Sequence, residues 1–356
     1  MNKVKRKVCL FVIFAVVACL IPGSAFAKAD YNWSFAQPWT RPLSDEGYKL
    51  FCKKVEEYSN GQIKIKFFAD GLLGTHDESF HGMQDGSIEV GAFSPYVSIV
   101  PGGMMNWMPW TIENWQEAKI AYANPTGILY KVMETAWNEV GGHLLFSVSQ
   151  GSYGLGDTVR PLRTPEDLKD LKMRVSASLA AVKMLENVGK GTGMTVQTLP
   201  WADLYNALSR GVVDGCWDMW PSLVQERHYE VLKYYSDVNF LWDNNNIVIN
   251  LDLWNSLSPE LKDAVNRAAS EAEAYLYKTG EEAETNFIKK LENSEGFTIV
   301  RLTHEERESW REKSNMPAVW DELCKPWLDK HYPGENMTQK VQDELNKIHE
   351  EVSAKQ

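Results

Sequence analysis

The stretch that decides the fold is TPEDLKDLKMRV, residues Thr164–Val175, together with LPWADLYNALSRGVVDG, residues Leu199–Gly215. The first segment predicts a capped turn that runs into a short strand carrying Arg174. The second predicts a loop bearing Trp201, then a helix, then a strand that begins near Val213. By itself, an arginine at the end of a short strand most often forms a structural salt bridge.

The residues before this stretch alternate between strand and helix patterns. Strict alternation predicts strands over 31–37 and 63–68, and helical spacing predicts a helix over 43–59 between them. A short helix over 77–86 and a strand over 88–93 follow. Strand, helix, strand, helix and strand in this order predict a parallel or mixed sheet with helices on its faces, which is an α/β fold.

The later residues predict a second sheet and a long helix. The apolar strand over 144–149 ends at Gln150-Gly151, the candidate crossing into a second domain, and 246–251 is the candidate return. Ser258 and Pro259 are typical of a helix start, and the helical pattern continues to about residue 291, longer than most globular helices. The second sheet is expected from strands over 171–175, 195–199, 215–217 and 234–240.

The N-terminus has the features of a secretory signal peptide. A basic stretch over 1–7 precedes an apolar stretch over 8–21, and Ala25-Phe26-Ala27 supplies a cleavage site after Ala27. A membrane anchor is the alternative, but the apolar stretch is shorter than the ~20 residues that span a bilayer. A lipoprotein acylated at Cys19 is a second alternative, which the poorly polar residues after Cys19 disfavour.

The chain is acidic. Its 356 residues carry a formal net charge of −11, and loss of 1–27 removes the four cations Lys3, Lys5, Arg6 and Lys7 and no anion, leaving −15. Such a surface disfavours nucleic acid and anionic lipid as partners. It does not exclude a small anionic ligand at a local arginine, because charges beyond ~10 Å are screened.

Cysteine usage predicts neither a disulfide framework nor a zinc site. Outside the signal, Cys52, Cys216 and Cys324 form no CxxC pair, so buried thiols are expected, with a Cys52–Cys324 bridge as the alternative. The fourteen tryptophans are far above ordinary usage. Several fall in predicted loops, which suits an aromatic pocket for a small ligand.

The mature chain resembles the solute-binding proteins of TRAP transporters, the DctP-type family. The motifs that carry the resemblance follow the family's order: Gly61-Gln62-Ile63, Gly71-Leu72-Leu73-Gly74, Gly86-Ser87-Ile88-Glu89-Val90-Gly91, Pro109, the Arg174 strand, Gly211–Gly215 and Trp254-Asn255-Ser256-Leu257-Ser258-Pro259. The resemblance implies a two-lobed periplasmic-binding-protein fold, each lobe a mixed sheet flanked by helices, with one long helix across both lobes. We expect a signal peptide over 1–27, lobe I over 28–150 plus 246–275, and lobe II over 151–245 plus 276–356.

The resemblance also implies that Arg174 holds the ligand's carboxylate, because a guanidinium matches an oxyanion with two parallel hydrogen bonds. The family often places Asn where this chain has Asp218, and Glu where it has Trp217. An aspartate beside an oxyanion repels it. Asp218 is therefore expected either to accept from a hydroxyl or ammonium of the ligand, or to turn away and brace Arg174.

Further ligand contacts are expected from strand ends and loops. Some relatives that bind sialic acid carry Arg where Tyr153 stands, so this ligand is disfavoured. Arg160 and Arg163 are expected to brace a loop or face solvent. The remaining candidates are Tyr153, Gln150, Trp201, Trp217, Trp242, Trp39, Ser94 and Tyr96.

No catalytic motif is present: the chain has no GxSxG, Walker loop or HExxH. His76 and His81 could form a metal pair, but a solvated helix face is favoured for both, so no metal or cofactor is expected. The resemblance implies a periplasmic monomer, not an enzyme, that delivers a small organic anion to TRAP permease subunits. The anion is expected to be a carboxylate, with a sulfonate, hydroxy acid, aromatic acid or amine-bearing acid left open. A periplasmic sensor for a membrane receptor and an exported enzyme are the alternatives.

Overall fold

The computed structural model describes residues 30–176 and 178–355, so the predicted signal peptide, its cleavage site and Cys19 lie outside the described residues. The described strands form one mixed sheet, whose order is β2-β1-β3-β8-β4-β7-β5-β6, with β9 beside β8. In chain order these strands are β1 (Tyr31–Ala36), β2 (Ile63–Phe68), β3 (Val90–Phe93), β4 (Gly142–Asp157), β5 (Lys172–Val175), β6 (Thr195–Thr198), β7 (Gly215–Met219), β8 (Tyr234–Asn250) and β9 (Thr298–Val300).

The first three strands and the two helices between them follow the sequence prediction closely. β1 pairs in parallel with β2 and β3, and α1 (Pro42–Tyr58) and α2 (His76–Asp85) connect them. Thr75 and Glu78 cap α2 reciprocally, and Gly86 ends it in the left-handed conformation, which glycine adopts without steric cost. The α/β fold class predicted from these patterns is confirmed.

Two long strands join both halves of the molecule, where separate sheets were predicted. The expected strand over 144–149 is part of the longer β4, and the two strands expected over 234–240 and 246–251 are one strand, β8. The two pair antiparallel along their length, with register shifts, one of them between Ser149 and Gly151. The prediction ended each strand too early because polar residues stand near the register shift. A strand that is buried on both faces does not need a regular alternation of apolar and polar residues. The boundaries of the two lobes stay a prediction, since the sheet is continuous across residues 150/151 and 245/246.

The second half of the sheet carries the stretch from which the fold was predicted. β5 pairs in parallel with β6 and with β7, and β7 pairs antiparallel with β4. The connections between these strands are η2 (Pro165–Leu168), α5 (Leu179–Val188), η3 (Trp201–Asp203), α6 (Leu204–Ser209), α7 (Trp220–Gln225) and η4 (His228–Glu230). The expected order of capped turn, strand, loop, helix and strand is therefore confirmed.

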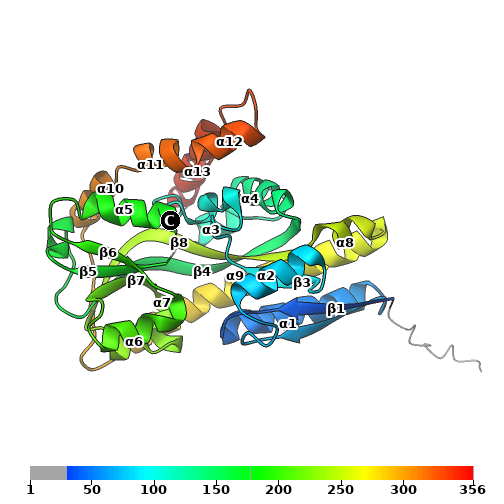
Figure 1. Ribbon diagram of the computed structural model, residues 1–356, viewed down its shortest axis with the longest axis horizontal. Helices are drawn as coiled ribbons and strands as arrows, with labels where there is room; N and C mark the ends of the chain where they lie inside the picture. Colours follow the sequence, from blue (N-terminus) through cyan, green and yellow to red (C-terminus); the bar gives the residue numbers. More distant parts are fainter. Residues whose placement is uncertain (1–29, 177, 356) are drawn as a thin grey trace, which may run out of the picture.

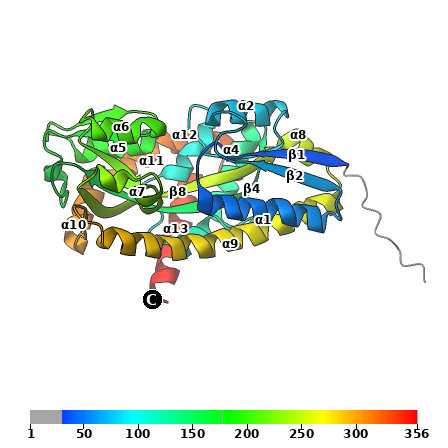
Figure 2. The same ribbon diagram turned by 90° about the horizontal axis from the view of Figure 1, so that it is seen from below.

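A long helix runs along the back of the sheet, as predicted. α8 (Leu251–Ser256) precedes α9 (Pro259–Glu292), which has 34 residues and is capped by Ser258. Figure 2 shows α9 lengthwise below both halves, with α1 beside it at one end. Gly47 of α1 lies against Leu276 of α9, where a larger side chain would collide, so the two helices approach closely.

The remaining helices form a layer over the other side of the sheet (Figure 1). They are η1 (Pro101–Trp107), α3 (Trp115–Ala121), α4 (Ile128–Glu139), α10 (His304–Ser314), α11 (Met316–Leu323), α12 (Lys325–His331) and α13 (Met337–Ser353). α10 and α11 contact α5, whereas α13 contacts α3 and α4. The C-terminal helices therefore bridge the two halves, and one continuous hydrophobic core includes residues of both.

Candidate ligand-binding site

A small cavity of about 30 Å³ lies between the two halves of the sheet. Its walls come from loops, from η1 and η3, and from the strands β4, β7 and β8. It is lined by Trp39, Arg41, Ser94, Tyr96, Trp107, Tyr153, Ser176, Trp201, Trp217 and Asp243. The first five belong to the predicted lobe I and the other five to the predicted lobe II.

Arg174 lies beside this cavity with an unsatisfied guanidinium. It is fully buried on β5, and Nε and Nη2 donate to the Leu199 carbonyl at 3.1 and 2.6 Å, whereas Nη1 has no partner. Burial lowers the pKa of Arg174, but a guanidinium stays charged in proteins. No described carboxylate lies within 4.0 Å of it to form an ion pair. A buried cation without an anion is costly, so this position is suited to an anionic ligand.

Trp201 connects Arg174 to the cavity. Its ring lies under the Arg174 guanidinium, 5.2 Å from the centroid, and lines the cavity itself. Its Nε1 donates to Glu226 at 2.6 Å, and its ring meets His228 edge-on at 5.4 Å between centroids. The aromatic expected in this loop is therefore held by polar contacts as well as by packing.

Asp218 does not line the cavity, because its carboxylate is bound within the protein. One oxygen accepts from the Met219 amide at 2.8 Å, and the other lies 2.7 Å from Nδ1 of His228. Burial alone lowers the pKa of His228, but Asp218 and Glu226 outweigh it and raise the pKa above its ordinary value. Asp218 and His228 therefore form a buried pair behind Trp201, a partnership that the sequence analysis did not anticipate.

Tyr153 and Trp217 form one wall of the cavity. Their rings stack with centroids 4.8 Å apart, because β4 and β7 pair here in antiparallel register. The indole Nε1 of Trp217 is buried without a partner. It is a second unsatisfied donor at the cavity wall.

Asp243 is a cavity residue that the sequence analysis missed. It is 4% exposed on β8, and its oxygens accept from Trp107 Nε1 at 2.6 Å and from the Tyr153 hydroxyl at 3.4 Å. Burial raises the pKa of Asp243, and the nearby charge of Arg41 opposes that effect. The available signal was a run of polar residues, Asp243 to Asn246, between apolar residues of a predicted strand region, because a buried strand rarely holds an acid without a partner.

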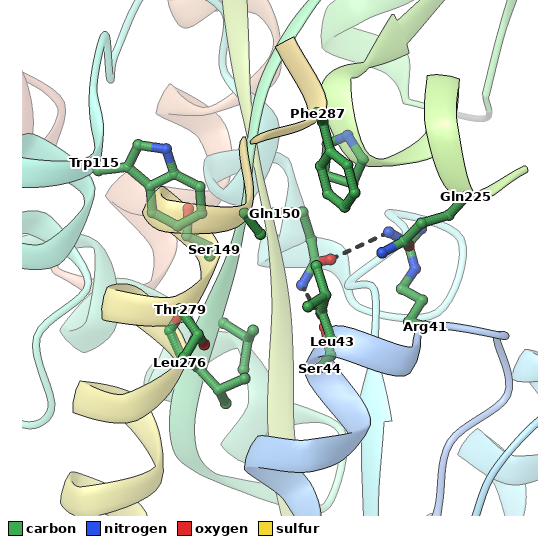
Figure 3. A pocket seen from close by; sticks show the side chains of 14 residues that line it. Arg41, Leu43, Ser44, Trp115, Ser149, Gln150, Gln225, Leu276, Thr279 and Phe287 are labelled. Carbon is green, nitrogen blue, oxygen red and sulfur yellow. Dashed lines mark hydrogen bonds between the residues drawn. The ribbon is translucent and has the colours of Figure 1, made fainter. Parts of the chain in front are cut away.

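Arg41 is the other important residue that was missed. It precedes α1 and is buried, its Nη1 donates to Gln150 at 3.2 Å, and its Nε has no partner. Figure 3 shows Gln150 between Arg41 and Ser44, in a second cavity of about 30 Å³ beside α9. Arg41 lines both cavities, so Gln150 positions Arg41 without reaching the central cavity itself.

Trp39 and Tyr96 close the cavity on the side of the first half. The ring of His76 packs against Trp39 at 5.3 Å and against Tyr96 at 4.9 Å, and its Nε2 accepts from the Ser94 amide. The expectation of a solvated face is wrong for His76, whose side chain is only 11% exposed, whereas His81 is exposed. Helical spacing alone did not show that the first turn of α2 faces the site.

Six of the ten predicted site residues line the central cavity: Trp39, Ser94, Tyr96, Tyr153, Trp201 and Trp217. Arg174 packs over the Trp201 ring just outside the lining, and Asp218, Gln150 and Trp242 also lie outside it. Trp242 donates to Ser149 and packs edge-on against Trp115, near the second cavity. Arg41, Trp107, Ser176 and Asp243 complete the lining and were not predicted.

The predicted bracing arginines face away from the site. Arg163 pairs with Glu306 at 3.1 Å, and Arg160 donates to the Lys169 carbonyl. The three described cysteines, Cys52, Cys216 and Cys324, are buried free thiols, as expected. Within 30–176 and 178–355, no cluster of metal-binding side chains is found, and no helix is long and apolar enough to cross a membrane.

A small cavity between two halves of one α/β sheet, with unsatisfied donors in and beside its wall, is typical of the ligand site of a two-lobed solute-binding protein. Residues 39–325 match the family model DctP, bacterial extracellular solute-binding protein, family 7. The chain therefore belongs to this family, the solute-binding proteins of TRAP transporters, which bind solutes and are not enzymes.

Curated relatives agree with this assignment. A solute-binding protein of Chromohalobacter salexigens is 25% identical over 70% of this chain and 73% of its own. The C4-dicarboxylate-binding periplasmic protein DctP of Rhodobacter capsulatus is 23% identical over 78% of this chain and 82% of its own.

Solved structures share the fold. A TRAP periplasmic solute-binding protein of Ochrobactrum anthropi superposes with a TM-score of 0.77 at 24% identity, covering 91% of this chain and 97% of its own. One of Haemophilus influenzae, solved with L-gulonate, gives a TM-score of 0.76 at 20% identity, covering 89% of this chain and 99% of its own.

Proposed function

We propose that this protein captures a small organic anion in the periplasm, a carboxylate first and a sulfonate second, and delivers it to TRAP permease subunits as a monomer. The observation that carries the proposal is the buried Nη1 of Arg174, which has no partner among residues 30–176 and 178–355 and lies beside the small cavity. A carboxylate or sulfonate supplies the missing acceptor and the missing charge together. Two more unsatisfied donors, Arg41 Nε and Trp217 Nε1, belong to residues that line the same cavity.

The ligands of similar proteins support this choice. The Rhodobacter capsulatus relative is named for C4-dicarboxylates, and solved structures at TM-scores of 0.72 and 0.76 hold succinate and β-D-glucuronate. All of these ligands are organic acids. Because the identities are below 25%, they support the chemical class of ligand and not its particular identity.

The proposed movement is closure of two lobes, 28–150 plus 246–275 and 151–245 plus 276–356, around β4 and β8. Ligand contacts from both lobes would favour the closed form, because a ligand shifts a conformational equilibrium only by its extra contacts in one state. Export is proposed to end with cleavage after Ala27. Intact mass of the protein recovered from the periplasm tests this, since acylation at Cys19 gives a different, lipid-bearing mass.

A thermal-shift screen of the chain from Lys28 onward tests the binding function. The panel holds carboxylates, sulfonates, hydroxy acids, amino acids and amines. A ligand at 100 times its Kd stabilises by about 2.7 kcal/mol, which raises the melting temperature by several degrees.

The matched variants are Arg174→Ala and Arg163→Ala. We expect Arg174→Ala to lose the thermal shift, because the guanidinium contact with the ligand is worth about 2–4 kcal/mol. We expect Arg163→Ala to keep it, because Arg163 forms a surface ion pair with Glu306 away from the cavity. A hit that survives in Arg174→Ala contradicts the site. Hits restricted to amines contradict the organic-anion function.

A further inference from the structure

Asp243 is a buried carboxylate at the cavity wall that forms no ion pair within the described part of the chain, although the charge of Arg41 is near enough to act on its pKa. It lies on β8 opposite Gly151, beside the register shift of the two long strands. Among residues 30–176 and 178–355, no lysine, arginine or histidine nitrogen lies within 4.0 Å of its oxygens. Charges this deeply buried are normally paired. The cavity is therefore the place where a partner for Asp243 is expected.

The hydrogen bonds of Asp243 leave one oxygen poorly satisfied. Trp107 donates to Oδ1 at 2.6 Å, whereas the Tyr153 hydroxyl is 3.4 Å from Oδ2, beyond the usual range for O–H···O bonds. An ionised carboxylate accepts at about four lone-pair positions, so Oδ2 has capacity for a stronger donor. Asp218 shows the contrast, because both of its oxygens already have partners within 2.8 Å.

Hydrogen-bond donors that need an acceptor lie around the same cavity. Arg41 Nε, Arg174 Nη1 and Trp217 Nε1 are buried donors without partners, which require acceptors. Tyr96, which lies in the wall, is within electrostatic reach of Asp243, Arg41 and Arg174 together. Two arginines and one aspartate leave the site with one net positive charge, which complements a ligand of net charge −1.

We propose that the ligand is a small hydroxy-substituted organic monoanion, whose oxyanion is held by Arg41 and Arg174 and whose hydroxyl donates to Asp243. This inference rests on the proposed function and names the substrate class of the same site. The hydroxyl is preferred to an ammonium because an amino acid is net neutral and leaves the positive charge of the site uncompensated. The cavity of about 30 Å³ holds little more than a water molecule before it adapts, so a short ligand is preferred.

The test is calorimetric titration with matched acids that differ only at the terminal carbon. The sets are acetate, glycolate and glycine; propionate, 3-hydroxypropionate and β-alanine; and butyrate, 4-hydroxybutyrate and 4-aminobutyrate. We expect the hydroxy acid of at least one set to bind about tenfold or more tighter than its unsubstituted partner, because the unsubstituted acid leaves Asp243 without a donor.

The variants are Asp243→Asn and, as matched control, Asp157→Asn. Asp157 is likewise a buried aspartate in a long strand, but its carboxylate caps the turn at Val159 and Arg160 and does not line the cavity. We expect Asp243→Asn to reduce the preference for the hydroxy acid to about threefold or less, because a charged acceptor is replaced by a neutral one. Asp157→Asn is expected to keep the full preference.

Each other outcome overturns the inference in a recognisable way. Equal binding of hydroxy and unsubstituted acids, or an unchanged preference in Asp243→Asn, removes the role of Asp243 and leaves the proposed function intact. Tighter binding of the amino acids overturns the hydroxyl assignment. Hits only among larger acids of the broad panel overturn the small-ligand class, whereas no hit among any anion overturns the proposed function itself.

Discussion

At the scale of single residues, the site is defined by donors and acceptors that the protein leaves unpaired. Arg174, Arg41 and Trp217 each have a buried nitrogen without a partner, although an unsatisfied buried group costs about 1–3 kcal/mol. Buried polar groups of folded proteins usually have a protein, water or ligand partner, so a ligand in the cavity is expected to satisfy these three nitrogens. Arg174 was predicted from its resemblance to a family strand, whereas Arg41 has no such motif and became visible only through its position beside the cavity.

Arg41 is expected to strengthen anion binding without being essential for folding. Arg41→Gln removes the charge at the cavity wall while keeping a polar side chain near Gln150. We expect affinity for the best organic anion to fall about 10- to 100-fold, because a hydrogen bond to a charged group is worth about 1.5–3 kcal/mol. Titration calorimetry measures this loss.

The matched control for Arg41 is Lys49→Gln. Lys49 is an exposed cation of α1, the helix that Arg41 precedes, and it pairs with Glu46. Its replacement is expected to leave affinity unchanged. An equal loss of affinity in both variants would mean that the net charge of the protein, and not the position of Arg41, controls anion binding.

The pair of Asp218 and His228 is expected to stabilise the fold in a pH-dependent way. The pKa of His228 is raised in the folded state, so its contribution is fully present below the ordinary value of 6.5 and is lost as pH rises through the folded-state pKa. We expect Asp218→Asn to lower the free energy of unfolding by about 2 kcal/mol at pH 6 and by less at pH 9. Denaturant titrations at both pH values measure the difference.

Equal losses at pH 6 and pH 9 would contradict this coupling. The sequence analysis also led us to expect that Asp218→Asn changes ligand preference more than folding. Affinities across the organic-acid panel test that expectation separately, and unchanged affinities would restrict Asp218 to a structural role.

At the scale of elements, the joint between β4 and the long helix α9 is the critical contact. Gly151 has a φ of +97°, a conformation that side chains disfavour, and a carboxylate oxygen of Glu284 on α9 lies where its side chain would be. The register shift between β4 and β8 occurs at the same place. The backbone conformation therefore favours glycine here, and a side chain at this position would also have to displace the carboxylate of Glu284.

Gly151→Ala is expected to lower the free energy of unfolding by about 2–3 kcal/mol, since it adds a collision to the conformational cost. Gly141→Ala is the matched control, because Gly141 has a φ of +81° with open space around it. It is expected to show the conformational cost alone, about 1 kcal/mol. Thermal denaturation compares the two, and equal losses would show that Glu284 yields without cost.

At the scale of the whole molecule, α9 places acidic side chains against the sheet that joins both halves. Burial raises the pKa of Glu284 to about 7 and that of Glu273 to about 8. Because these values exceed the ordinary 4.5, the folded state binds their protons more tightly, and the protein loses stability as pH rises from about 4.5 to 8. Part of each side chain is exposed, which reduces the effect.

Glu284→Gln is expected to remove part of this pH dependence. The variant carries no charge at this position, so we expect it to be more stable than the parent by about 1–2 kcal/mol at pH 8 and nearly equal at pH 4.5. Melting temperatures across this range measure the effect. Glu281→Gln, at an exposed glutamate one turn earlier, is the control, and the same gain there would assign the effect to net charge.

The sequence by itself determined the local elements and the family. Alternation and helical spacing gave β1, α1, β2 and α2, and cap residues gave the start of α9, because these signals act between neighbours in the chain. Family motifs in the expected order indicated the solute-binding class and Arg174, and the family match confirms the class. Such features need no knowledge of which distant residues meet.

Only the tertiary structure decided how β4 and β8 continue across both halves and which polar groups meet at the cavity. Asp243, Arg41 and His76 come from segments far apart in sequence, and their roles depend on burial and on the absence of a partner among the described residues. Asp218 is the opposite case. The sequence analysis expected it at the ligand or beside Arg174, but in the structure its carboxylate is hydrogen-bonded to His228. Pairing and desolvation are properties of long-range contacts, so no local pattern carries them.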